Sequence, residues 1–240
     1  MSETLRAGWT AVVGHPLFFI GLTLVAYQLS LWVYERTRIA LLHPVLGSVA
    51  MLVVALLALD VDFPAYRDAV GPLLVLLGPA TVALAVPLYL NLRRIRQFLV
   101  PILITLLVGG VFATLSVVLI GWLFDARPMI LMTLAPKSVT TPIAMLVAEQ
   151  LGGVAALAAV FVMFTGVLGA IIGPWLLTRA GVREPAARGL AMGMTAHAVG
   201  TARALEEGEE TGAFSALAMS LMGMATAVLL PLAVAAWHWL

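Results

Sequence analysis

Residues 98–124 read FLVPILITLLVGGVFATLSVVLIGWLF, and this stretch contains no Asp, Glu, Lys or Arg. A helix needs about 20 consecutive apolar residues to cross a bilayer, so the stretch is long enough for one crossing. Residues 69–92 and 150–178 are equally free of these four charged residue types. Runs of this length are not needed in soluble cores, so we expect an all-α integral membrane protein, a polytopic helical bundle.

The composition of the whole chain agrees with a protein embedded in a lipid bilayer. Of its 240 residues, 62% are hydrophobic and 10% are charged, whereas a soluble domain carries about a quarter charged residues. The net charge of +1 offers no basic surface, so nucleic acid is not an expected partner. The absence of cysteine excludes disulfides and thiolate metal sites. We take a bacterial inner membrane, crossed several times, as the default location.

The hydropathy pattern predicts six spans and leaves two ambiguous segments. The spans are expected near 16–34, 43–60, 70–91, 98–123, 154–178 and 213–237, and the ambiguous segments are 128–148 and 189–206. Pro72, Pro79 and Pro87 predict kinks or a break in the third span, because proline removes an intrahelical hydrogen bond.

Basic loops set the orientation, since Lys and Arg tend to stay on the cytoplasmic side. Arg36 and Arg38 place the first loop inside, and the arginines of 93–96 and of 179–188 place two later loops inside. Segment 128–148 must then begin and end outside. It cannot be a simple crossing.

The ambiguous first segment is interrupted at residues 134–145, LAPKSVTTPIAM. Pro136 and Pro142 break the helix, and the hydroxyl groups between them can satisfy the freed backbone groups. Non-helical backbone at membrane depth survives only where protein or a water-filled cavity satisfies it. The segment is therefore expected to dip in and return, or to form two short half-helices around the break.

The second ambiguous segment repeats the first. Residues 137–158 and 197–218 align without a gap and share eight identities in 22 positions, with Lys137 opposite His197. We interpret this as an internal duplication with repeat units 128–180 and 188–240 inside a single transmembrane domain, 1–240. Each unit holds one broken segment and one full span, so the copies should have opposite orientations. Inverted repeats with interrupted helices are typical of secondary transporters.

Two stretches, APKSVTTPIAM (135–145) and AHAVGTARALEEGEETGAFSALAM (196–219), resemble the most recognisable segments of the LrgB/CidB family. The resemblance implies two descriptions. One is a holin- or antiholin-like modulator of murein hydrolase activity and cell lysis that acts with a small LrgA/CidA-type membrane protein, expected here to be a separate chain. The other is carriage of small carboxylates, namely pyruvate in bacteria and glycolate and glycerate in the plastid members.

The residues at the two breaks are the candidate binding site for a small carboxylate anion. Intramembrane charges are costly and are functional by default, and half-helix N-termini favour an anion. The candidate substrate-binding residues are Lys137, Ser138, Thr140, Thr141, His197, Thr201 and Arg203.

Each candidate also has a plainer interpretation. Lys137 could extend to a nearby interface, and His197 could be a neutral histidine bound to a backbone carbonyl. Arg203 could pair with Glu206 or Glu207 at helical spacing, an alternative that we favour slightly. Hydroxyl groups at helix breaks commonly cap backbone groups.

Other charged residues suggest less. The acidic run Glu206, Glu207, Glu209 and Glu210 is expected to be a solvated loop, and Asp60 and Asp62 to mark the end of a span. No HExxH, GxSxG or P-loop pattern occurs, so we expect no enzyme, no cofactor and no metal site.

Two functions follow as hypotheses. The main one is a secondary transporter of small monocarboxylates, coupled to a proton or another cation. The alternative is a holin/antiholin-like protein that modulates murein hydrolase export and cell lysis, which would favour helix faces that form homo-oligomers.

Overall fold

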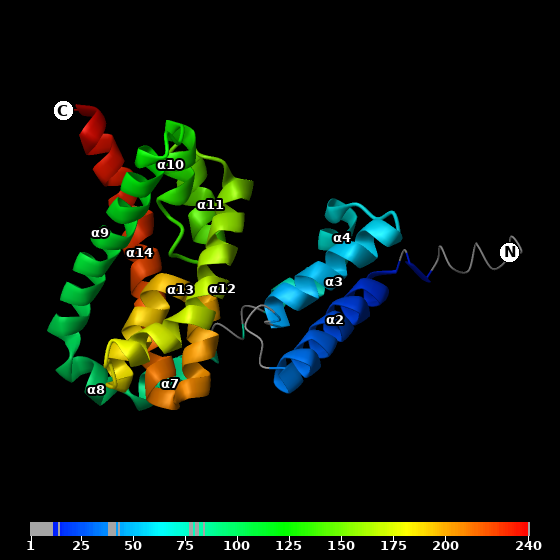
Figure 1. Cartoon of the computed structure of the whole chain (residues 1–240), viewed down its shortest axis with the longest axis horizontal. Helices are drawn as coiled ribbons and strands as arrows, with labels where there is room; N and C mark the ends of the chain where they lie inside the picture. Colours follow the sequence, from blue (N-terminus) through cyan, green and yellow to red (C-terminus); the bar gives the residue numbers. More distant parts are fainter. Residues whose placement is uncertain are drawn as a thin grey trace, which may run out of the picture. The chain divides into compact units, whose positions relative to one another are not determined.

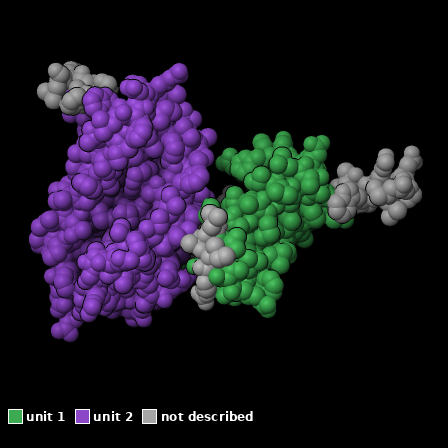
Figure 2. All heavy atoms as spheres, in the orientation of Figure 1, with its two compact units in different colours: residues 1–83 green, residues 84–240 purple. Residues whose placement is uncertain are grey.

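A computed structural model gives the structure of residues 12–13, 15–37, 42, 44–76, 79, 82–83 and 85–239. Every regular element in these ranges is a helix (Figure 1), which confirms the expected all-α class. Arg38 and His43 lie outside the described residues. The chain forms two compact units, residues 1–83 and residues 84–240 (Figure 2), and each is described by itself.

Four helices within the described ranges are long and apolar enough to cross a membrane. They are α2 (Pro16–Thr37), α9 (Leu99–Leu123), α12 (Ala155–Arg179) and α14 (Glu209–Trp239), the last over Glu209–Ala236. Large apolar side chains such as Leu107 and Phe112 remain exposed along α9, as contact with lipid requires. The protein is a multi-pass membrane protein.

In the first unit, α3 (Pro44–Ala58) is followed by α4 (Phe63–Ala69) at a bend of 116°. Asp62 caps α4, because its side chain accepts a hydrogen bond of 3.3 Å from the Ala65 N–H. This places Asp62 at the end of the apolar helix, as its sequence position indicates. The hydroxyl of Tyr66, in α4, lies 2.8 Å from the Thr23 hydroxyl of α2.

The expected span 70–91 is not one continuous helix. Helix α5 (Gly71–Val75) ends early, and α7 (Ala85–Leu90) belongs to the second unit. This agrees with the break that the prolines predict. Residues 77–78, 80–81 and 84 lie outside the described ones.

The second unit contains α7, α8 (Leu92–Gln97), α9, α10 (Pro128–Leu134), α11 (Thr141–Gln150), α12, α13 (Pro185–Glu207) and α14. The first turn of α14 contacts α8 through the Arg94–Glu210 ion pair, and α12 begins beside α10 at Thr133. Helices α12 and α14 therefore run in opposite directions (Figure 1). Arg94 also pairs with Glu184, so the loops around 93–96 and 179–188 lie at one end, as the basic-loop rule predicts.

The core of the second unit lies where these helices meet. It includes Ile102 of α9, Val162 of α12 and Phe214 of α14, which are fully buried. Val139 joins this cluster from the interruption between α10 and α11. The broken backbone is thus covered by protein on its inner side, which satisfies the condition for irregular backbone at membrane depth.

Candidate functional site

The first broken segment is a re-entrant hairpin, hereafter the first hairpin (residues 128–150). Helix α10 ends at Leu134, and α11 begins at Thr141 after a run of turns. The Val154 N–H donates a 2.9 Å hydrogen bond to Thr133 Oγ1, whose own proton goes to the Met129 carbonyl at 2.6 Å. The chain after the hairpin thus returns to α10. The expected pair of short half-helices is confirmed.

Helix α13 is a second hairpin (residues 185–207), made of two helical legs that meet at a kink. The backbone of His197 has φ 42° and ψ −129°, which is not helical. Arg188 and Glu207, 19 residues apart, form a bidentate pair with N–O distances of 2.8 and 3.1 Å. A straight helix would separate these residues by about 28 Å. The legs 185–196 and 198–207 must therefore fold back on each other at His197.

His197 at this turn is held beneath α12. Its Nε2–H donates a 3.0 Å hydrogen bond to the Val162 carbonyl, and the residue is 4% exposed. Room for the ring comes from Gly166, where a Cβ atom would lie 2.6 Å from the ring Cε1. This hydrogen bond to a backbone carbonyl is the one that the plainer interpretation of His197 predicts. Val139 of the first interruption belongs to the same buried cluster as Val162, so the two turns are linked through this cluster.

Thr201 lies one helical turn after His197 and links the turn to α14. Its hydroxyl donates to the His197 carbonyl at 2.9 Å and lies 2.9 Å from the Ser215 hydroxyl. Because the Thr201 proton is committed to the carbonyl, Ser215 is the donor in the second bond. Thr201 therefore joins the second leg of the hairpin to α14. Ser215, fully buried on α14, was missed by the sequence reasoning, since its repeat counterpart Ala155 has no hydroxyl.

Lys137 is a partly buried cation in the first interruption. Its ammonium donates a 2.9 Å hydrogen bond to the hydroxyl of Ser138, which is 7% exposed. No Asp or Glu in the described ranges forms an ion pair with it. Thr140 and Thr141 follow at the start of α11, partly buried, and the Thr140 side chain makes no capping bond. The candidate anion-binding role of these residues stays a prediction.

Arg203 is not brought to Lys137 by any contact between described residues. It lies on the returning leg of the second hairpin and pairs with Glu206 at 2.7 Å, with side-chain exposures of 35% and 68%. This is the alternative that its helical spacing favours. Arg203 as a binding residue stays a prediction.

The expected solvated acidic loop is instead formed by two helix ends, in which Glu206 and Glu209 are exposed as expected. Glu206 and Glu207 end α13, while Glu209 and Glu210 begin α14, separated by Gly208 with φ 153°. Acidic residues in a first helical turn complement the helix dipole. Glu210 also pairs with Arg94, and the hydrogen bond to Glu184 and the charge of Glu210 raise the pKa of Arg94.

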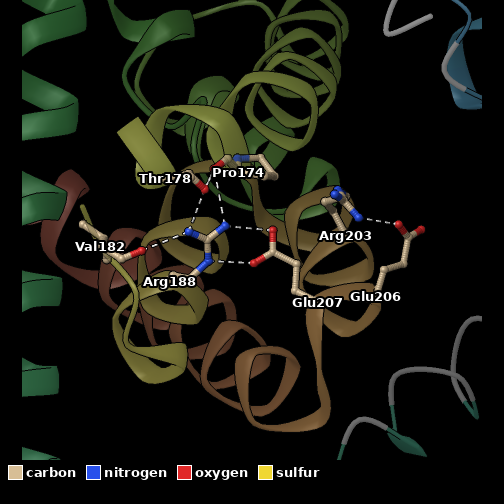
Figure 3. A network of polar contacts seen from close by, with 7 residues as sticks. All are labelled: Pro174, Thr178, Val182, Arg188, Arg203, Glu206 and Glu207. Atoms are coloured by element: carbon tan, nitrogen blue, oxygen red, sulfur yellow. Dashed lines mark hydrogen bonds and ion pairs between the residues drawn. The ribbon is translucent and has the colours of Figure 1, made fainter. Parts of the chain in front are cut away.

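Arg188 is the centre of a polar network at the base of the second hairpin (Figure 3). Besides Glu207, its guanidinium donates to the Val182 carbonyl at 3.0 Å, to Thr178 Oγ1 at 3.3 Å and to the Pro174 carbonyl at 3.3 Å. The side chains of Arg188 and Glu207 are 14% and 16% exposed. The end of α12 and both legs of the hairpin are thereby joined.

Several contacts match between the repeat units. The paired alanines Ala144 and Ala204 are both fully buried, and the chain after each hairpin passes beside its first part. Thr133 meets Val154 in the first unit, and Gly193, at the position equivalent to Thr133, packs on the Ser215 backbone in the second. The units 128–180 and 188–240 stay a prediction that these contacts support.

Comparison with known proteins now identifies the family. The family model described as LrgB-like family matches residues 23–236. This chain belongs to the LrgB-like family. The LrgB-like chain is 36% identical to the uncharacterized protein YxaC of Bacillus subtilis over 222 residues, which are 92% of this chain and 96% of that protein.

Two further relatives have informative names. The holin-like protein CidB of Staphylococcus epidermidis is 33% identical over 90% of this chain and 94% of its own length. The antiholin-like protein LrgB of Bacillus cereus is 28% identical over 90% and 95%, respectively. No solved structure matches. These bacterial relatives indicate a cytoplasmic membrane, and the LrgB-like family is not a known enzyme family.

Proposed function

We propose that this LrgB-like protein is a holin- or antiholin-like membrane protein that modulates cell lysis, the role that the names of its relatives support most directly. This role includes a separate LrgA/CidA-type membrane protein as partner. Expression in a bacterium that lacks its own LrgB-like and LrgA-like proteins tests the proposal. Lysis rate and murein hydrolase activity should change when both chains are present. Unchanged values with both chains would refute it.

The geometry favours a second candidate, a carrier for small monocarboxylates such as pyruvate, glycolate or glycerate. The single observation that supports it is Lys137, a partly buried ammonium with no acidic partner among the described residues, in the turn of a re-entrant hairpin. An intramembrane cation of this kind is expensive unless it has a function. A passive pore has little need for it.

A carboxylate could reach this cation from the meeting point of the two hairpins. Lys137 would donate a charge-assisted hydrogen bond, which contributes about 1.5–3 kcal/mol. Helix α11 and the leg 198–207 both begin next to the turns, so their N-terminal N–H groups add positive potential. Ser138, Thr140 and Thr141 would take the remaining oxygens of a hydroxy- or keto-acid.

The roles of the other candidates are narrower than a direct contact. The donor groups of His197 and Thr201 are already used in hydrogen bonds within the protein. These residues would therefore shape the site from the second hairpin and would not contact the anion directly. Coupling to a proton or another cation is part of this proposal. The two functions are compatible, since a changed carboxylate flux alters the energetics of the envelope and thereby lysis.

Uptake of labelled pyruvate and glycolate into proteoliposomes tests the carrier. The wild-type chain should give saturable uptake, Lys137→Ala should abolish it, and Arg183→Ala is the control because that cation is exposed and lies outside the candidate site. Uptake lost equally in both variants would refute the assigned site. Absence of uptake by folded wild-type protein, with and without an LrgA/CidA-type chain, would refute the carrier and leave the lysis role.

A further inference from the structure

The base of the second hairpin differs from that of the first in how it is closed. In the first hairpin, Thr133 of α10 accepts a neutral hydrogen bond from Val154, which follows the hairpin at the start of α12. The second is closed by the ion pair between Arg188 and Glu207, and no acid–base pair between described residues closes the first one. Because a charged pair between described residues closes only the second hairpin, we expect the two hairpins to differ in mobility.

We propose that Arg188 is a latch that holds the second hairpin shut on the cytoplasmic side, and that this hairpin is the part that moves when the site opens to the cytoplasm. The proposal adds a moving part to the proposed carrier function, and it rests on that function. Arg188 is a positioning residue in this scheme. It contacts Glu207, and through the hairpin it determines where His197 lies.

The contacts of Arg188 are arranged as a latch requires. Its guanidinium bonds to α12 through the Pro174 carbonyl and Thr178, and to the returning leg through both oxygens of Glu207 (Figure 3). Both side chains are mostly buried, so removal of one charge leaves the other uncompensated. The planar fork of arginine is needed for these bonds, and lysine could not reproduce them.

The second hairpin packs closely on the face of α12 that bears Gly166, Gly169 and Gly173. A Cβ atom at these positions would meet His197, Ala196 and Met192, respectively. The absence of side chains on this face of α12 lets the hairpin approach the helix closely.

The turn itself is held under strain. His197 has φ 42°, in a region that favours glycine. This conformation costs free energy in a histidine, so it persists only where surrounding contacts enforce it. The Val162 bond and the Arg188 latch are the contacts that fix the turn from either end. Release of the latch would let the strained turn relax.

A single cysteine at position 215 reports on the hairpin. The chain contains no cysteine, so one introduced thiol is the only one in the protein. Ser215 is 0% exposed, with Thr201 of one leg bonded to its hydroxyl and Gly193 of the other leg against its backbone. The substitution Ser215→Cys changes one atom, and the thiol becomes accessible only when a leg moves away.

The experiment measures the rate at which a membrane-impermeant maleimide labels Ser215→Cys in inside-out and right-side-out vesicles. Adding Glu207→Gln should raise the rate about tenfold or more from the cytoplasmic side only, because loss of a partly buried ion pair shifts the opening equilibrium by at least that factor. Adding Glu206→Gln is the matched control. It removes an exposed pair on the same leg and should leave the rate unchanged.

Equal rates with Glu207→Gln and Glu206→Gln would overturn the latch, and so would an equal rise from both membrane sides. If Glu207→Gln gives no monodisperse protein, Arg188→Lys takes its place, since it retains the charge and loses the fork. An unchanged rate in that variant also overturns the proposal. Labelling requires no transported anion, so a failed latch and a failed carrier give separate results.

Discussion

Gly166 on α12 offers a stringent test of how His197 is held. A Cβ atom at this position would lie 2.6 Å from Cε1 and 2.7 Å from Nε2 of the His197 ring. Contacts below 3.0 Å cannot persist, so Gly166→Ala must push the ring away from α12. The ring cannot move outward and still donate to the Val162 carbonyl, now at 3.0 Å.

The magnitude follows from three contributions. Overpacking of a filled core costs about 1–3 kcal/mol, and loss of a buried hydrogen bond costs about 1–3 kcal/mol. Alanine in place of a helical glycine returns about 1 kcal/mol. The expected net destabilisation is about 1–5 kcal/mol. A shift of roughly 2–4 °C in Tm accompanies each kcal/mol in chains of this length.

The assay is thermal unfolding of the purified protein in detergent, with Gly173→Ala as the matched control. Gly173 lies on the same helix, and its Cβ would also meet an atom at 2.6 Å, the sulfur of Met192. A flexible thioether can turn away where an anchored imidazole cannot. Gly173→Ala should therefore change stability by less than about 1 kcal/mol. Equal Tm values for the two variants would refute the reasoning that the ring is fixed.

Substitutions at three further positions have defined outcomes in the same unfolding assay. Thr201→Val should destabilise by about 1–3 kcal/mol, because the buried Ser215 hydroxyl loses its bond to Thr201 and the His197 carbonyl loses the Thr201 hydroxyl; a Tm equal to wild type would contradict this role of Thr201. Thr133→Val should cost a similar amount by leaving the Val154 N–H unpaired, and it should increase proteolysis within the first hairpin. His197→Gly should be more stable than His197→Ala by about 1 kcal/mol or more, since both lose the ring but only glycine accepts φ 42° without strain; the reverse order would show that the turn relaxes to helix.

The first hairpin could be predicted from sequence because its determinants are local. Pro136 and Pro142 flank the interruption, and the basic loops on either side require an even number of passages between them. The structure confirms both half-helices and the return of the chain to α10. The two prolines that interrupt the helix are thus also the residues from which the interruption can be predicted.

The second hairpin could be located but not described from sequence. Its turn occurs at His197, which is neither proline nor glycine, so the residue type at the turn does not predict a positive φ. Its closure depends on Arg188 and Glu207, whose pairing spans 19 residues and is invisible to a search for helical spacing. The same limit explains the acidic run, which has the composition of a loop and acquires Arg94 and Arg188 as partners only when α8 and the first leg of α13 are in place.

The binding site shows a similar division. The unpaired Lys137 could be singled out because a charge inside apolar sequence is conspicuous. Ser215 could not, since a serine within an apolar helix has no pattern that reveals a hydroxyl partner on another helix. Sequence thus indicates the groups that are costly to bury, and the structure supplies the groups that compensate them.

The fold-back of α13 has a consequence for how the protein is made. This segment carries Arg188, Arg203, Glu206 and Glu207, so it is a poor candidate for independent entry into the membrane as it leaves the ribosome. Gly189 and Gly193 pack directly on the backbone of α14, which is synthesised later. The segment must therefore wait at the membrane surface until α14 has been translated, which makes its insertion a late step of biogenesis.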